Sequence, residues 1–142
     1  MNCIITSTDA YEKLNSNKNS ILIDIRTPEE WKHFGVPKLN SNQIEFLSWP
    51  LLADAQLLEL FWYNLKQLVK KKNDSLATDA DINIKDQPLE LFFICKAGGR
   101  SAFAASYAAN IFDHPSYNII DGFEGTYDMH GWKRNNLPWQ QI

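Results

Sequence analysis

Cys95 is followed by a short cationic segment rich in glycine, in the order Cys-Lys-Ala-Gly-Gly-Arg-Ser. A mostly apolar run over 89–94 precedes it and an alanine-rich helix pattern follows, which predicts a buried strand, a turn and the start of a helix. The N–H groups and the dipole at a helix N-terminus favour an anion. A thiol in that position, beside Lys or Arg, ionises more readily than a free thiol. We therefore expect Cys95 to be a nucleophile that needs no separate base, rather than a buried structural thiol.

The residues after Cys95 suit an anion-binding loop. Gly98 and Gly99 permit positive φ angles and let backbone N–H groups approach a ligand closely. We expect Arg100 either to contact a bound anion or to fold back onto carbonyls of the loop. Ser101 is expected to bond to an anion or, as the favoured role, to cap the helix. The predicted anion-binding loop consists of Lys96, Ala97, Gly98, Gly99, Arg100 and Ser101.

Asp24 and Arg26 form a second candidate group at the end of a short, β-branched run over 21–25. Thr27 and Glu30 then have the spacing of a helix capping box. Open α/β sheets bind ligands at the carboxyl ends of their strands, so Asp24 and Arg26 are candidates to support the site. The favoured alternative is a structural ion pair that ties the strand end to a neighbouring loop.

Strand patterns alternate with helix patterns along the chain, which predicts an α/β fold with a mainly parallel sheet. The 142 residues suffice for one domain with a hydrophobic core and are too few for two. The longest helix is predicted from about Asp54 to Lys72, because its leucines and Phe61 follow a 3.6-residue period. The polar, breaker-rich segment over about 73–88 predicts a long, mobile connection.

Composition excludes several classes of protein. A net charge of −3 and a pI near 5.5 disfavour nucleic-acid binding. The two cysteines, Cys3 and Cys95, are too few for a disulfide scaffold, which favours a reducing, cytoplasmic location. We expect no signal peptide and no membrane span, since even the most apolar window carries charged residues. His33, His114 and His130 lack metal-ligand spacing, so no metal is expected.

Several segments in the same order resemble the rhodanese family of sulfurtransferases. The loop after Cys95 resembles the active-site loop of that family, and the strand ending in Asp24-x-Arg26 resembles its first signature. The remaining segments are Gly35-Val36-Pro37, the strand and turn over 117–125, Gly131-Trp132 and Leu137-Pro138-Trp139. Together these motifs cover most of the chain.

The resemblance implies a single rhodanese-like domain over residues 1–142, with a central sheet of about five strands and helices on both faces. It implies a thiosulfate sulfurtransferase in which Cys95 carries sulfane sulfur as a persulfide, with no cofactor. The expected partners are a small anionic sulfur donor and a thiol, protein thiol or cyanide as acceptor, with neither nucleic acid nor membrane. Lys96 stands where many members have Arg, which leaves the identity of the sulfur donor open. Thr126 to His130 form a short insertion whose role is also open.

Three alternatives have different consequences. An interaction module would keep the fold and bind a partner in its groove; the intact Cys95 disfavours it, and the broad apolar surface of the 54–72 helix favours it slightly. A Cys–His hydrolase would need a histidine beside Cys95, and no histidine lies in a segment that resembles a hydrolase motif. Phosphatases and arsenate reductases of related architecture generally have five residues between Cys and Arg, whereas this chain has four. The shorter loop favours a single sulfur atom over a phosphoryl group.

Overall fold

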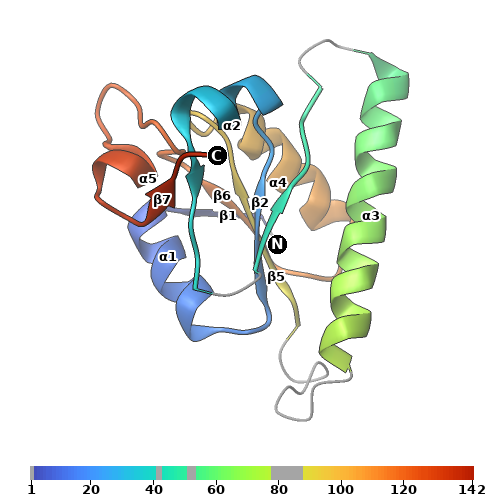
Figure 1. The fold of residues 1–142 in the computed structure, drawn as a ribbon. Helices are drawn as coiled ribbons and strands as arrows, with labels where there is room; N and C mark the ends of the chain where they lie inside the picture. The colour runs from blue at the N-terminus through green and yellow to red at the C-terminus, as the bar shows by residue number, and fades with distance from the viewer. Residues whose placement is uncertain (1, 41–42, 51–53, 78–87) are drawn as a thin grey trace.

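A five-stranded sheet forms the centre of the protein in a computed structural model that describes residues 2–40, 43–50, 54–77 and 88–142 (Figure 1). Its strands are β1 (Asn2–Ile5), β2 (Ser20–Asp24), β4 (Ile44–Phe46), β5 (Glu90–Ile94) and β6 (Ser116–Ile119). They lie in the order β1-β6-β5-β2-β4, and every neighbouring pair is parallel. Because Asp24 of β2 is in register with Ile94 of β5, the segments that follow these two strands emerge at the same edge of the sheet.

Helices cover both faces of this sheet (Figure 1). The helices are α1 (Ser7–Ser16), α2 (Pro28–Phe34), α3 (Ala55–Ala77), α4 (Gly99–Ile111) and α5 (Gly131–Arg134). A small antiparallel pair, β3 (Val36–Pro37) with β7 (Trp139–Gln140), lies beside them. The predicted α/β architecture, with a parallel sheet of five strands and helices on both faces, is confirmed.

The two faces of β2 explain its nearly continuous apolar sequence. Ile21 and Ile23 pack into one buried cluster with residues of α3 and α4, while Leu22 packs into a second cluster with residues of α1 and α5. Parallel strands that are covered on both faces require apolar residues at successive positions. Burying each such side chain contributes about 1.5–3 kcal/mol to the transfer free energy.

Helix α3 is longer than the sequence pattern predicted. It extends to Ala77, so residues 73–77 are helical and do not belong to a connection. Leu76 continues the buried stripe of Leu65 and Val69, and Lys70 forms an i,i+4 ion pair with Asp74 at 2.9 Å. The apolar stripe and the i,i+4 pair outweigh the polar composition of this turn. Residues 78–87, the rest of the predicted connection, lie outside the described residues.

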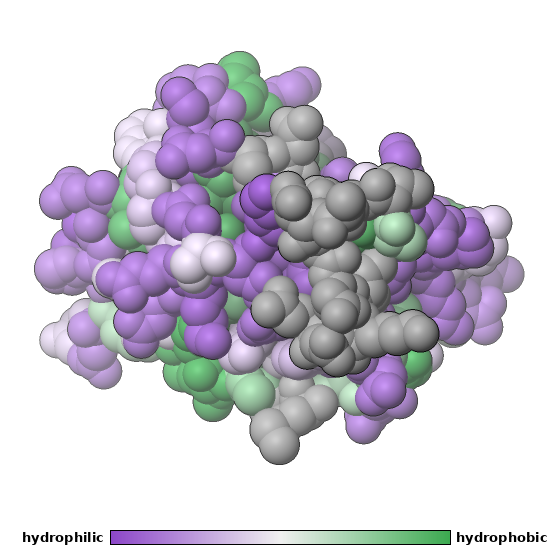
Figure 2. All heavy atoms as spheres, turned by 90° about the horizontal axis from the view of Figure 1, so that it is seen from below, coloured by the Kyte–Doolittle hydropathy of each residue, from purple (hydrophilic) through white to green (hydrophobic). Residues whose placement is uncertain are grey.

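The opposite edge of the sheet, where β2 and β5 begin, presents mainly hydrophilic residues with smaller hydrophobic groups between them (Figure 2). Within the described ranges, no helix is both long and apolar enough to cross a membrane. Asp24, the last residue of β2, and Cys95, which follows β5, lie at the other end of these strands.

Candidate functional site

Cys95 directly follows β5 and lies at the N-terminus of α4. Its side chain is 1% exposed. The Sγ atom accepts hydrogen bonds from the N–H groups of Gly98, at 3.2 Å, and Ser101, at 3.4 Å. Two backbone donors, one from the loop and one from the first turn of α4, therefore point at the sulfur. Such donors stabilise negative charge on a sulfur atom at this position.

The turn after β6 holds this loop in place. The N–H of Phe123 donates to the Cys95 carbonyl at 2.9 Å, and that of Glu124 donates to the Lys96 carbonyl at 3.0 Å. Gly122 has a φ of 64°, and a Cβ there would collide with the Lys96 carbonyl. The backbone of the turn thus packs directly under the loop, which fixes the direction of the donors around Cys95.

Gly98 and Gly99 have different roles, although the same role was predicted for both. Gly98 has a φ of 91°, and a Cβ on it would collide with the backbone of Ile120. Gly99 is the first residue of α4, and nothing lies within 4 Å of a Cβ built on it. Only Gly98 is required by the backbone geometry, so the expectation of positive φ is wrong for Gly99.

Ser101 does not cap the helix. The N-cap of α4 is Gly98, which makes no side-chain cap, and Ser101 lies inside the first turn. Its fully buried hydroxyl lies 3.2 Å from Cys95 Sγ and donates to Asn118 Oδ1 at 2.5 Å. Asn118 of β6 was not predicted, because a strand asparagine carries no signal of its own until the register places Asn118 beside β5.

Arg100 does not fold back onto loop carbonyls but binds Glu30 of α2. Its two terminal nitrogens donate to the two carboxylate oxygens at 2.7 and 2.9 Å. Glu30 also accepts from the backbone of Thr27, so the predicted capping box is confirmed and shares its carboxylate with Arg100. This second role was not predicted, because the capping spacing already accounts for a glutamate at position 30. The bidentate pair occupies much of the guanidinium that was expected to bind an anion.

Charge in this pair is strongly stabilised. Burial alone would raise the pKa of Glu30, but hydrogen bonds from Arg100 and from the Thr27 backbone outweigh it and lower the pKa to about 2. The hydrogen bond to Glu30 raises the pKa of Arg100. Both groups are therefore ionised throughout the neutral range.

Replacing Glu30 by glutamine is expected to destabilise the protein by about 1–2 kcal/mol at neutral pH, since hydrogen bonds to charged groups are stronger than neutral ones. The folded-state pKa of Glu30 lies below its ordinary value of 4.5, so its contribution is present above about pH 4.5 and is lost as the pH falls towards 2. Urea unfolding at pH 7 and pH 3 measures this. The wild-type protein should lose more stability between these pH values than E30Q; equal losses would contradict the role of the pair.

Asp24 and Arg26 form a fully buried ion pair, with Arg26 Nη2 at 2.8 Å from Asp24 Oδ2. The same nitrogen donates to the Gly35 carbonyl at 2.9 Å, which ties the strand end to the segment after α2. The guanidinium also lies over the Phe123 ring, 4.2 Å from its centroid. This geometry is that of the favoured structural pair. Phe123, which lies against the guanidinium, also donates its backbone N–H to the Cys95 carbonyl and so links the pair to the loop.

Lys96 and Ala97 are exposed at the surface of the loop. The predicted insertion forms a turn in which the N–H of Thr126 donates to the Met129 carbonyl at 2.8 Å, with Tyr127 fully exposed. His114 lies beside Asn73, and across the described part of the chain no histidine bonds to Cys95. The same residues hold no group of three potential metal ligands. The geometry therefore gives no support to a Cys–His pair.

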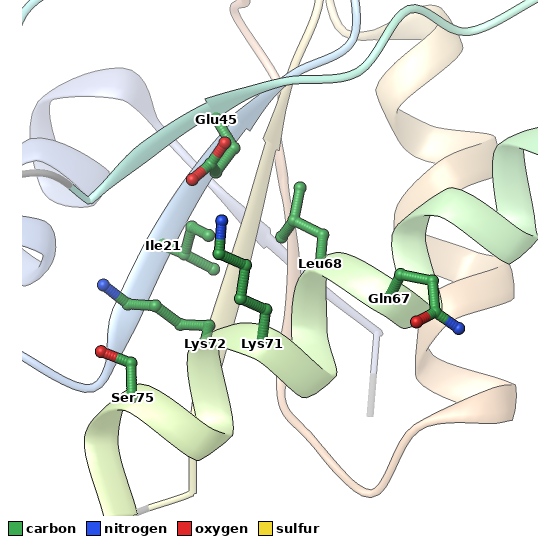
Figure 3. Close-up of a pocket in the computed structure, with 7 residues that line it drawn as sticks. All are labelled: Ile21, Glu45, Gln67, Leu68, Lys71, Lys72 and Ser75. Atoms are coloured by element: carbon green, nitrogen blue, oxygen red, sulfur yellow. The ribbon is translucent and has the colours of Figure 1, made fainter. Parts of the chain in front are cut away.

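Two hollows lie away from the Cys95 loop. One, of about 500 Å³, lies between α3 and the β2–β4 edge, with Lys71 reaching towards Glu45 (Figure 3). The other, of about 440 Å³, is an apolar groove between α3 and α4, where the Trp62 and Tyr107 rings stack. Phe61 and Leu65 of α3 are core residues, whereas Leu60 and Tyr63 of its broad apolar surface are exposed. Neither hollow contains a nucleophile from the loop.

No protein-family model matches the chain. It is 42% identical over 137 residues to uncharacterized protein RC0915 of Rickettsia conorii, covering 96% of this chain and 95% of that protein. The crystal structure of Rv0390 from M. tuberculosis is similar with a TM-score of 0.71 and 30% identity, covering 100% of this chain and 98% of that one. The solution structure of a polysulfide-sulfur transferase homodimer from Wolinella succinogenes is similar with a TM-score of 0.63 and 21% identity, covering 99% of this chain and 79% of that one. Both solved structures have the rhodanese-like fold.

Proposed function

Because this chain belongs to one family with RC0915 and Rv0390 and has a rhodanese-like fold, we propose that it is a sulfurtransferase that carries sulfane sulfur on Cys95. The observation that supports this most directly is the pair of N–H groups, from Gly98 and Ser101, that donate to Cys95 Sγ at the start of α4. They stabilise an anionic sulfur without a base. The name of the Wolinella structure, a polysulfide-sulfur transferase, agrees with this chemistry.

In the first step of the proposed cycle, the Cys95 thiolate attacks the outer sulfur of a donor such as thiosulfate. A sulfur–sulfur bond forms to Cys95, and the bond between the two donor sulfurs breaks. Sulfite leaves with the electron pair of that bond, and Cys95 becomes an anionic persulfide. The number of electrons is conserved within the two reactants, so no redox cofactor is required.

In the second step, an acceptor thiolate or cyanide attacks the terminal sulfur of the persulfide. The new bond carries that sulfur away as a persulfide or thiocyanate, and the electron pair of the broken bond returns to Cys95 as thiolate. Backbone N–H groups at the start of α4 stabilise the charge on the terminal sulfur between the two steps.

The small anionic donor meets little free cationic charge from Arg100, because Glu30 holds both of its terminal nitrogens. Exposed Lys96 and the helix N-terminus are then the groups that favour a donor anion and its leaving group. The single positive point charge of Lys96 lacks the planar fork that selects one oxyanion geometry. We therefore propose that the site accepts inorganic polysulfide as well as thiosulfate.

Intact mass spectrometry after incubation with thiosulfate or polysulfide tests the proposal. The expected product is the protein with one added sulfur atom, located on Cys95 by peptide mapping, and cyanide should remove it. C3S is the matched control, since it removes the other cysteine and should still accept one sulfur. If C3S and the wild-type protein accept no sulfur from either donor, the sulfurtransferase proposal fails.

The wild-type protein is expected to lack activity towards p-nitrophenyl phosphate. A Cys-based phosphatase needs its arginine free to bind the phosphoryl oxygens, but here a carboxylate occupies the guanidinium of Arg100. Four residues between Cys95 and Arg100 also make a shorter cradle than the phosphatase loop. Release of p-nitrophenol measures this reaction, with thiocyanate formation as the reference. Phosphate hydrolysis faster than sulfur transfer would assign the protein to the phosphatases.

A further inference from the structure

The hydrogen bonds of Asn118 assign the direction of every proton in the chain Cys95–Ser101–Asn118. Asn118 Nδ2 lies 3.2 Å from the Gly98 carbonyl, which only accepts, so the amide nitrogen must face it. This orientation turns Oδ1 towards Ser101, and Oδ1 only accepts. The single proton of the Ser101 hydroxyl is therefore donated to Asn118.

Ser101 then has no proton left for Cys95. Its oxygen lies 3.2 Å from Sγ, so a hydrogen bond between them exists only when the thiol carries its proton and donates it. In the thiolate, two acceptors would face each other unless the Ser101 hydroxyl turns away from Asn118. That turn would leave Asn118 Oδ1 without its partner at a position that is 6% exposed, which is costly.

From this proton inventory we infer that Asn118 is a positioning residue that holds the Ser101 hydroxyl away from Cys95 and so opposes the free thiolate. The two N–H donors of the loop favour the thiolate, and the Ser101–Asn118 pair counteracts them. The effect of Asn118 on the Cys95 thiolate stands by itself, whereas its effect on sulfur transfer rests on the proposed function. Once a persulfide forms, the negative charge lies on the terminal sulfur and no longer on Cys95 Sγ. The Ser101 hydroxyl can then donate to Asn118 without a charged sulfur facing its oxygen.

The consequence for sulfur transfer is a preference for the loaded state. The unloaded thiolate requires the Ser101–Asn118 bond to break or two acceptors to face each other, whereas the thiol and the persulfide do not. Asn118 thereby shifts the equilibrium between the unloaded Cys95 thiolate and the Cys95 persulfide towards the persulfide. The sulfur therefore stays on Cys95 until an acceptor arrives.

The charged groups around Cys95 do not account for this effect, because they are common to all the variants compared below. They are Lys96 in the loop, Arg100 of α4 with Glu30 of α2, Asp24 with Arg26 at the end of β2, and Glu124 of the turn after β6. Asn118 and Ser101 are uncharged, so replacing them by apolar residues changes hydrogen bonding without changing net charge.

A double-mutant cycle separates this role from a structural one. Four proteins are made in a C3S background, so that iodoacetamide reports Cys95 alone: the parent, S101A, N118L and S101A/N118L. The alkylation rate is measured from pH 5 to 10, with circular dichroism to check the fold. N118A replaces N118L in the cycle if the leucine variant does not fold.

In the presence of Ser101, N118L frees the hydroxyl to donate to the thiolate. The pH of half-maximal alkylation should fall by about one pH unit, which is about a tenfold faster reaction on the acidic side. In the S101A background the same substitution should change the profile little, because no hydroxyl remains to be freed. The inference would be overturned if N118L changed the pH of half-maximal alkylation similarly in both backgrounds. It would also be overturned if, with Ser101 present, this pH did not change or rose.

Sulfur uptake measured on the same four proteins distinguishes the two proposals. If N118L shifts the alkylation profile only when Ser101 is present but the parent takes up no sulfur, the role of Asn118 stands and the sulfurtransferase function is refuted. If the parent takes up sulfur but the effect of N118L does not depend on Ser101, the sulfurtransferase function stands and the role of Asn118 is refuted. In proteins that take up sulfur, N118L should release it to cyanide faster than the parent, and an equal or slower release would refute the preference for the loaded state.

Discussion

Replacing Cys95 by serine is expected to abolish sulfur transfer, with a loss on the order of a thousandfold or more in kcat/KM. A serine hydroxyl at neutral pH is too weak an acid to supply the nucleophile, and no other described group in the loop can hold the transferred sulfur. Thiosulfate-dependent formation of thiocyanate measures the loss. The buried oxygen retains the donors from Gly98 and Ser101, so C95S should fold like the wild-type protein.

C3S is the control for this experiment, because Cys3 lies on β1 and has no place in the loop. It should keep nearly all of its activity. Full activity in C95S, or loss of activity in C3S alone, would move the proposed persulfide away from Cys95.

Replacing Gly98 by alanine is expected to reduce activity about a hundredfold, whereas Gly99→Ala should leave it nearly unchanged. A Cβ at Gly98 requires a left-handed backbone for alanine and collides with the backbone of Ile120, so the loop must shift. Displacing catalytic donors by about 1 Å is sufficient for a loss of this size. The strain should also lower the free energy of unfolding by about 1–3 kcal/mol.

Gly99 provides a control on the same loop. It lies in a helical turn with open space around its Cα, so alanine fits and stabilises the helix by up to about 1 kcal/mol. Sulfur-transfer kinetics and urea unfolding of both variants check the contrast. Equal effects at the two positions would show that glycine at 98 serves no special backbone geometry.

The sequence predicted those parts of the fold that depend on local patterns. The β-branched run over 21–25, the capping box at Thr27 and the strand before Cys95 each carry a short-range signal, and the structure confirms each of them. The end of α3 was mispredicted because its polar residues resemble a connection, while Leu76 extends the buried stripe. Tertiary packing of one leucine outweighs the local composition there.

The site was predictable only where its residues are neighbours in sequence. The loop around Cys95 is one continuous segment, so its type and spacing indicate its chemistry. Glu30 and Asn118 come from segments 70 and 17 residues away from their partners, Arg100 and Ser101. Their contacts follow from the order of the strands, which a single sequence does not specify. This is also why the capping role expected of Ser101 and the fold-back expected of Arg100 were wrong.

The placement of β1 at the edge of the sheet has a consequence for how the protein folds during synthesis. Its strand partner, β6, comes more than a hundred residues later, and Ser7 binds Asp121 through both its N–H and its hydroxyl across 114 residues of sequence. The first strand cannot pair until residues 116–121 have been synthesised, and contacts of such high sequence separation form slowly. Asp121 immediately precedes Gly122, whose backbone packs against Lys96. The loop around Cys95 therefore reaches its final geometry only after the turn that follows β6 has been synthesised and has docked beneath it.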